Sequence, residues 1–308
     1  MIEVTNLTKT YGTNTAVDDL SFTVRPGIVT GFLGPNGSGK STTMRMILGL
    51  DRPTSGTATV NGRTLNRHGA PLTEIGALLE AKAVHPKRSA RNHLNALALT
   101  NGIPARRVDE VLDIVGLTEV ADKAAGQFSL GMGQRLGIAS ALLGNPATVM
   151  LVEPVNGLDP EGVLWIRHLL RDLAAEGRTV LVSSHLMSEM ALTADHFVII
   201  GRGRMIADVT AAELEAMAPE ASVTVGSSDP QRLRQLLARD GVEVTSTGHG
   251  LLSVVGVDSA EIGRIAADHA IALSELSNHR STLEETFMGL TADAVDYGAR
   301  SLVTAEAA

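Results

Sequence analysis

The stretch from Gly34 to Ser41 constrains this chain most, because it fits the pattern Gly-x-x-x-x-Gly-Lys-Ser/Thr of a phosphate-binding loop. The apolar run before it, residues 28–33, is typical of a buried strand, and residues 42–50 after it are typical of a helix. The first N–H groups of a helix are unpaired and carry partial positive charge, so they attract phosphate. The predicted phosphate site consists of Gly34, Pro35, Asn36, Gly37, Ser38, Gly39, Lys40 and Ser41. In such a loop Lys40 reaches the β- and γ-phosphates, and the Ser41 hydroxyl is a ligand for Mg²⁺.

Length and charge limit the classes of protein that this chain can belong to. With 308 residues it is long enough for one large domain and a smaller one. A net charge of −8 gives no general electrostatic case for binding nucleic acid, so we expect no nucleic-acid partner. The chain has no cysteine, which excludes disulfides and thiolate metal sites and fits a reducing compartment. We find no signal peptide and no run of 18 apolar residues, so any membrane role is expected to come through a partner chain.

The hydrophobic pattern changes along the chain. Apolar and polar residues alternate through residues 1–30, which predicts antiparallel strands, and a strand at 57–60 precedes an Asn61-Gly62 hairpin turn. From about residue 89 to 145 the apolar spacing is helical. Apolar runs between helices, typical of parallel strands buried on both faces, occur at residues 147–152, 179–183 and 195–200.

The pattern of predicted strands and helices changes again beyond about residue 219. We expect a β-α-β-β-α-β order, which is ferredoxin-like, from strands and helices at residues 222–225, 230–239, 242–245, 251–255, 259–269 and 271–276. A capping box, Ser281-Thr282-Leu283-Glu284, predicts the start of a last helix. We therefore divide the chain into a large domain at 1–218, an accessory α+β domain at 219–291 and a loose tail at 292–308.

Further motifs accompany the phosphate loop in a fixed order. They are Tyr11-Gly12, Phe128-Ser129-Leu130-Gly131-Met132, Met150-Leu151-Val152-Glu153-Pro154, Asn156-Gly157-Leu158-Asp159 and Ser183-Ser184-His185. In this order and spacing they resemble the motifs of the nucleotide-binding subunits of ATP-binding cassette (ABC) transporters, over roughly residues 2–218. So many ordered motifs are far more specific than a phosphate loop alone.

The resemblance implies an α/β fold: a P-loop NTPase cassette with a mixed sheet core, an antiparallel β subdomain and a helical subdomain. It implies that Tyr11 stacks on adenine, that residues 34–41 and Thr42 hold the phosphates, and that ATP and Mg²⁺ are the cofactors. Glu153 resembles the general base and His185 the residue that contacts the γ-phosphate. Ser129, Gly131 and Asp159 would complete the ATP site of a second copy, so a homodimer is expected with ATP. A tyrosine near a strand end also commonly serves packing alone, and that alternative stays open for Tyr11.

Three positions depart from the family pattern. Glu80 stands where the family has the Q-loop glutamine, and it offers Mg²⁺ an oxygen together with an added negative charge. The stretch 128–132 corresponds to the signature motif of the family, and it carries Leu130 and Met132, as in some drug-resistance cassettes. Val152 replaces the aspartate that supports Mg²⁺, and loss of such a supporting carboxylate typically costs ~10–100-fold in metal affinity or activity.

These features favour the ATP-binding and hydrolysing subunit of an ABC exporter of drugs, antibiotics or similar amphipathic compounds. We expect it on the cytoplasmic face of the membrane, bound to an integral membrane permease subunit. The basic residues His85, Lys87, Arg88 and Arg91 are either a solvated face or a contact surface for that subunit. The alternatives are a soluble ABC-type ATPase acting on the ribosome or DNA, and a regulatory cassette that hydrolyses ATP poorly, which Val152 favours.

Overall fold

The computed structural model describes residues 1–80, 83–184, 187–218, 220–248, 250–279 and 282–294. Its strands are β1 Ile2–Tyr11, β2 Asn14–Val24, β3 Val29–Leu33, β4 Ser55–Val60, β5 Ile75–Leu78, β6 Thr148–Val152, β7 Thr179–Ser183, β8 His196–Gly201, β9 Arg204–Thr210, β10 Ser222–Ser227, β11 Glu243–Gly248, β12 Leu251–Val255 and β13 Leu273–His279. Its α-helices are α1 Lys40–Ile47, α2 Pro71–Glu74, α3 Ala90–Thr100, α4 Arg106–Ile114, α5 Leu130–Leu142, α6 Pro160–Ala175, α7 Met187–Ala191, α8 Ala211–Ala216, α9 Pro230–Leu237, α10 Ser259–Asp268 and α11 Leu283–Thr291. They form two compact units, one of Met1–Ala211 together with the described residues 290–294 and one of Ala212–Gly289.

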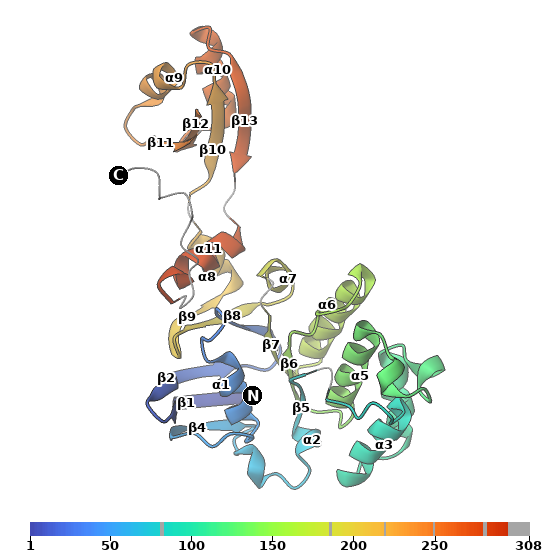
Figure 1. The fold of residues 1–308 in the computed structure, drawn as a ribbon. Coiled ribbons are helices and arrows are strands. Elements are labelled where there is room, and N and C mark those ends of the chain that lie inside the picture. The colour runs from blue at the N-terminus through green and yellow to red at the C-terminus, as the bar shows by residue number, and fades with distance from the viewer. Residues whose placement is uncertain (81–82, 185–186, 219, 249, 280–281, 295–308) are drawn as a thin grey trace. The chain divides into compact units, whose positions relative to one another are not determined.

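A mixed sheet forms the centre of the first unit, with the strand order β5-β6-β7-β3-β8-β9 (Figure 1). Strands β5 to β8 run parallel, and only β9 pairs antiparallel with its neighbour in this sheet. Every residue of β3 is buried, as expected for a strand covered on both faces. The predicted parallel strands are therefore confirmed, and the phosphate loop leaves the sheet from its interior strand β3.

A second, antiparallel sheet of order β2-β1-β4 packs its apolar face on the mixed sheet. The rings of Phe22 and Phe32 stack across this boundary with centroids 5.3 Å apart. The predicted antiparallel strands of residues 1–30 are thus confirmed. At Asn61-Gly62 both residues have positive φ, and Val60 and Arg63 exchange backbone hydrogen bonds across the turn. The chain continues into a short 3-10 helix, Leu65–Arg67, rather than a second hairpin strand.

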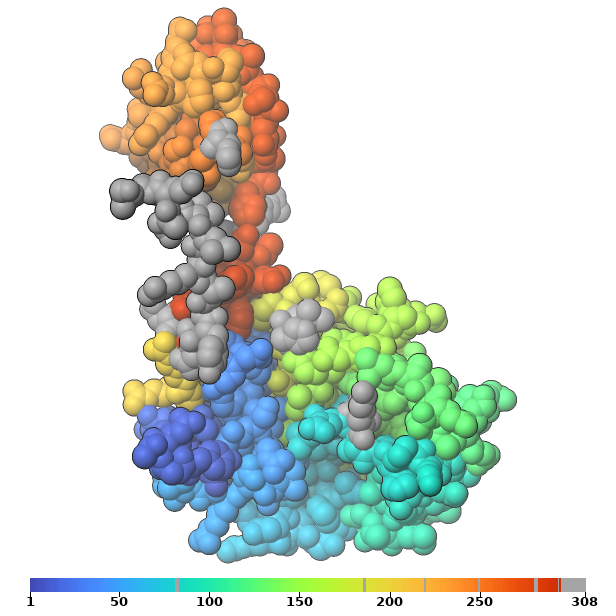
Figure 2. Space-filling view, in the orientation of Figure 1, coloured from blue at the N-terminus to red at the C-terminus, as the bar shows by residue number. Residues whose placement is uncertain are grey.

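Helices fill the segment between β5 and β6, where the sequence predicts them. Helices α3, α4 and α5 pack on one another, and α5 also packs on β5 and β6. Figures 1 and 2 show this helical part, coloured cyan to green, on the opposite side of the first unit from the blue N-terminal strands. Because α5 begins at the signature motif, its packing on the sheet sets where that motif lies.

At Gly76 strand β5 lies directly against the backbone of helix α5. A Cβ at Gly76 would lie 1.7 Å from the Ala141 carbonyl oxygen, which is backbone and cannot rotate away. We expect Gly76→Ala to lower the free energy of unfolding by ~1–3 kcal/mol, the usual cost of overpacking a core. Urea denaturation measures this, with Gly69→Ala as the control, because nothing lies within 4 Å of a Cβ there. An unchanged midpoint for Gly76→Ala would show that α5 and β5 separate easily.

The second unit has a four-stranded antiparallel sheet of order β11-β12-β10-β13. Two helices, α9 and α10, connect its strands, and their leucine and isoleucine side chains build its core against β10 and β12. This is the ferredoxin-like β-α-β-β-α-β arrangement that the sequence predicts.

The last helix, α11, starts with a capping box shifted by one residue from the predicted one. The Thr282 hydroxyl accepts from the Glu285 N–H at 3.2 Å, and the Glu285 carboxylate accepts from the Thr282 N–H at 3.0 Å. The predicted pairing of Ser281 with Glu284 depends on Ser281, which lies outside the described residues. The predicted loose tail begins with a short 3-10 helix, Ala292–Ala294, and residues 295–308 also lie outside them. Within the described part of the chain, no helix is both long and apolar enough to cross a bilayer.

Candidate functional site

The phosphate loop joins β3 to α1 and depends on two kinds of glycine. Gly37 and Gly39 have φ of 80° and 100°, in the left-handed region that favours glycine. Gly34 has no room for a side chain, since a Cβ there would lie 2.3 Å from the Ile200 carbonyl oxygen. Helix α1 begins at Lys40, two residues earlier than predicted, and the chain turns out of it at Gly49, whose φ is 66°. The N–H groups of Lys40, Ser41 and Thr42 therefore open the helix without intrahelical partners.

Lys40 folds back over this loop. Its Nζ donates to the carbonyl oxygens of Gly34 at 2.5 Å and Pro35 at 3.0 Å. Burial lowers the pKa of the Lys40 ammonium, and the negative charge of Glu153 acts in the opposite direction. Lys40 and Glu153, far apart in the sequence, are thus brought within electrostatic reach of each other.

The loop also contains a buried hydroxyl without a protein partner. Ser38 Oγ is inaccessible to solvent and forms no hydrogen bond with any described residue. Ser41, by contrast, is exposed at the first turn of α1, where its hydroxyl is free to face a ligand. Unpaired helix amides, an ammonium on loop carbonyls and an orphaned hydroxyl together fit a phosphate chain.

Glu153 follows directly after strand β6 in a strained backbone conformation. Its φ is 49°, which is uncommon for a residue with a side chain. Its N–H donates to the Ser183 carbonyl oxygen at 2.7 Å, and its carboxylate accepts from the Ser184 hydroxyl at 3.4 Å. The Glu153 carboxylate is thus held at the edge of the sheet next to the phosphate loop.

The signature motif, residues 128–132, contacts residues 156–159, which correspond to the D-loop of the family. Ser129 caps helix α5, its Oγ accepting from the Met132 N–H at 3.2 Å, and Asp159 caps α6 by accepting from the Gly162 N–H at 2.9 Å. Both residues are exposed. A Cβ at Gly131 would lie 2.9 Å from the Gly157 carbonyl oxygen, so these two backbones approach closely. The exposed N-terminus of α5 is available to a ligand outside this protomer.

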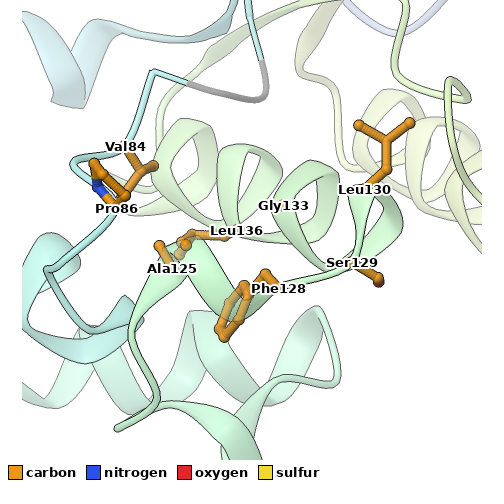
Figure 3. A pocket seen from close by; sticks show the side chains of 9 residues that line it. Val84, Pro86, Ala125, Phe128, Ser129, Leu130, Gly133 and Leu136 are labelled. Carbon is orange, nitrogen blue, oxygen red and sulfur yellow. The ribbon is translucent and has the colours of Figure 1, made fainter.

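A cavity of about 530 Å³ lies beside the signature motif (Figure 3). Val84 and Pro86 line one side of it, across from Leu136 of helix α5, and Phe128 lies at its margin. Among the predicted site residues it includes Ser129.

Tyr11 lies at the tip of the β1–β2 hairpin with 49% of its surface exposed. The Lys9 ammonium lies 4.8 Å from the centre of its ring, and its hydroxyl donates to Asp51 at 3.4 Å. Asp51 in turn is paired with Arg45 of α1 at 2.7 Å, and this hydrogen bonding lowers the pKa of Asp51. These contacts hold the half-exposed tyrosine ring beside helix α1.

Glu80 and Val152, two of the positions that depart from the family pattern, lie in different environments. Glu80 is exposed two residues after β5, and its charge lies near the Arg45 guanidinium. Val152 pairs with Ser183 across β6 and β7 and packs against the apolar core that joins the two sheets. His185 lies outside the described residues.

Comparison with known proteins decides the family. The family model described as ABC transporter matches residues 17–156. The bacitracin transport ATP-binding protein BcrA of Bacillus licheniformis is 43% identical over 212 residues, covering 68% of this chain and 69% of that protein. This chain belongs to the ABC transporter ATP-binding proteins. The linearmycin resistance ATP-binding protein LnrL of Bacillus subtilis is 32% identical over 305 residues, covering 94% of this chain and 98% of that protein.

Solved structures agree with the ABC cassette fold. A dimeric ATP-binding cassette in a post-hydrolysis state, bound to ADP and Pi, is similar with a TM-score of 0.64 and 25% identity. It covers 68% of this chain, and the match covers 99% of that structure. The family hydrolyses ATP, so the ABC cassette here is an ATPase. A second family model, described as a domain of unknown function, matches residues 221–284 in the second unit.

Sequence reasoning missed one residue at this ABC site, Gln134 of helix α5. Its side chain is only 3% exposed and donates to the Glu153 carbonyl oxygen at 2.9 Å. The signal was present in its spacing, because Gln134 shares a helix face with the buried residues Ile138 and Ala141. A polar residue on an apolar face needs a buried partner.

Proposed function

We propose that this chain is the ATP-binding and hydrolysing subunit of an ABC exporter. The observation that carries the proposal is the juxtaposition of a phosphate loop, with its unpaired amides and Lys40, and the Glu153 carboxylate. Calorimetric titration of the full chain with ATP and Mg²⁺ tests it, with phosphate release measured on the same sample. A chain that binds no ATP would overturn the proposal.

Each site residue has a role in this proposal. Residues 34–42 hold the phosphates, and Tyr11 offers a π-face to adenine. Glu153 accepts a proton from the attacking water while the bond between the β- and γ-phosphates breaks, giving ADP and phosphate. We assign His185 to the γ-phosphate on the family resemblance.

Mg²⁺ would neutralise charge on the phosphates when bound. The chain offers it oxygen from the Ser41 hydroxyl and, in this proposal, from Glu80. No cluster of three or more histidine or acidic side chains forms a ready metal site in the ranges that the structure describes. Mg²⁺ would therefore depend mainly on Ser41 and the phosphates of the nucleotide, as is common for this ion.

The active assembly in this proposal is a homodimer formed on ATP. Support comes from the exposed N-terminus of α5 at Ser129 and Gly131, which is placed to bind the ATP of a second copy, and from the exposed cap Asp159. The similar solved cassette is dimeric.

The second partner in this proposal is an integral membrane permease, and this chain lies peripherally on the cytoplasmic face. We place the contact on the described residues 79–80 and 83–88, because cavities of about 530 and 440 Å³ are lined by residues of these stretches. Of the basic cluster, Arg91 is paired with Asp109 and Asp122, which leaves His85, Lys87 and Arg88 for the contact. The names of the relatives favour an exported antibiotic or similar amphipathic compound as cargo, and they speak against a ribosome or DNA role.

Val152 makes hydrolysis slow in this proposal, because valine offers Mg²⁺ no oxygen and orders no water. We expect Val152→Asp to raise activity or Mg²⁺ affinity by ~10–100-fold, the usual effect of a supporting carboxylate. Phosphate release as a function of Mg²⁺ concentration measures this. Melting with and without Mg²⁺-ATP separates the gain from the cost of a carboxylate beside the apolar core that Val152 contacts.

Val152→Thr serves as the comparison variant, because it keeps the shape of valine and replaces one methyl group with a hydroxyl, so it separates the effect of a carboxylate from that of a single polar oxygen. If the wild type already hydrolyses ATP rapidly and Val152→Asp adds nothing, another group supports the metal and this role of Val152 is wrong. If the wild type and Val152→Asp both bind ATP and neither hydrolyses it, the chain is better explained as a regulatory cassette.

A further inference from the structure

Helix α5 is joined to the backbone of Glu153 by a buried side chain. Gln134 Nε2 donates to the Glu153 carbonyl oxygen at 2.9 Å, and Gln134 is 3% exposed. A buried amide donor is costly to leave unpaired, so this hydrogen bond persists as long as α5 and the end of β6 keep their places.

The backbone of Glu153 depends on such external support. With φ at 49° it occupies a conformation that a residue with a side chain adopts only when its surroundings impose it. The Glu153 N–H donates to the Ser183 carbonyl oxygen at the end of β7. The Glu153 carbonyl oxygen accepts from the Asn156 N–H of the same turn at 3.2 Å and from Gln134 of α5, and Gln134 is the contact that comes from the helix. Removing the Gln134 hydrogen bond leaves the Glu153 backbone held by Ser183 and Asn156 but no longer tied to α5.

Helix α5 makes a second contact with the chain that follows Glu153, and this contact is made by residues of the signature motif. Gly131 and Leu130 lie against Gly157, where a Cβ would be 2.3 Å from Leu130 Cγ. Helix α5 therefore contacts the segment 153–159 at two places. Gln134 contacts Glu153 at the start of that segment, and Leu130 and Gly131 contact Gly157 near its end. A shift of the α5 N-terminus has to move Glu153 or break one of these contacts.

We propose that Gln134 is a positioning residue that couples the signature motif to the catalytic carboxylate of the same protomer. This inference rests on the proposed function, in which α5 binds the ATP of a second copy and Glu153 activates water. When Ser129 and Gly131 bind the nucleotide of the second copy, α5 is held in place. The hydrogen bond from Gln134 then holds Glu153 in place as well. The hydrogen bond thus makes hydrolysis at one site sensitive to occupancy of the other.

Gln134→Met in the full chain tests the coupling, because methionine keeps the length of the side chain and removes the amide that donates to Glu153. The matched control is Arg135→Met. Arg135 Nη1 also donates from α5 to a backbone carbonyl at 3.0 Å, but to Val115, away from Glu153. We expect Gln134→Met to lower kcat by ~10–100-fold, the effect of a small misplacement of a catalytic group. ATP affinity should stay unchanged, and the Hill coefficient for ATP should fall toward one.

Several outcomes decide between the accounts. Unchanged kcat and Hill coefficient in Gln134→Met, or an equal fall of kcat in Arg135→Met, would overturn the inference, because Gln134 then only stabilises the helix. A wild type that releases no phosphate would overturn hydrolysis in the proposed function instead. In that case hydrogen exchange at Glu153 and Asn156 decides the inference. ATP should protect these amides in the wild type and not in Gln134→Met, and equal protection in both would overturn it.

Discussion

Glu153→Gln is expected to lower the rate of ATP hydrolysis by ~10²–10⁴-fold, the contribution of a positioned general base. The amide cannot accept a proton from water, but it keeps the volume of the side chain and an oxygen that still accepts from Ser184. Binding should be unaffected, since Lys40 and the loop amides remain. The variant should therefore accumulate as an ATP-bound dimer, visible by size-exclusion chromatography with ATP.

Glu119→Gln provides the control, because Glu119 is exposed in the helical part of the first unit. It should hydrolyse ATP like the wild type. If Glu153→Gln retained the wild-type rate, Glu153 would not be the base and its strained backbone would need another explanation.

Lys40→Ala is expected to weaken ATP binding by ~10–100-fold, because a hydrogen bond to a charged group contributes ~1.5–3 kcal/mol. In the free protein the Lys40 ammonium is bonded to the Gly34 and Pro35 carbonyl oxygens, so alanine removes both contacts and the only positive side chain within the loop. Phosphate release should fall with binding. Titration calorimetry measures the affinity directly.

Lys123→Ala is the matched control, an exposed lysine in the loop before the signature motif. It removes the same charge far along the chain from the phosphate loop and should bind ATP normally. Equal affinities for Lys40→Ala and Lys123→Ala would sink the assignment of the loop.

Much of the architecture could be predicted because it rests on local patterns. The apolar runs that became β6, β7 and β8 and the helical spacing of α3 to α5 are properties of short windows. The ferredoxin-like order of the second unit followed from the same signals. The capping box of α11 shows the limit, since Ser281 and Thr282 are equally good caps in sequence and only the structure shows that Thr282 and Glu285 form one.

The site was predictable to the extent that it consists of motifs. The phosphate loop, Glu153 and Ser129 lie where their motifs suggest, yet no motif shows that Gln134 reaches Glu153 or that Gly131 lies against Gly157. Those contacts join α5 to the end of β6, residues that are far apart along the chain, and only the packing of α5 on the sheet determines them.

Phosphate release from ATP by the purified full chain tests the account most directly. We predict slow release that saturates with ATP, requires Mg²⁺ and falls to background in Glu153→Gln while ATP binding persists. Release that is equal in the wild type and Glu153→Gln, or a wild type that neither binds ATP nor releases phosphate, would contradict it.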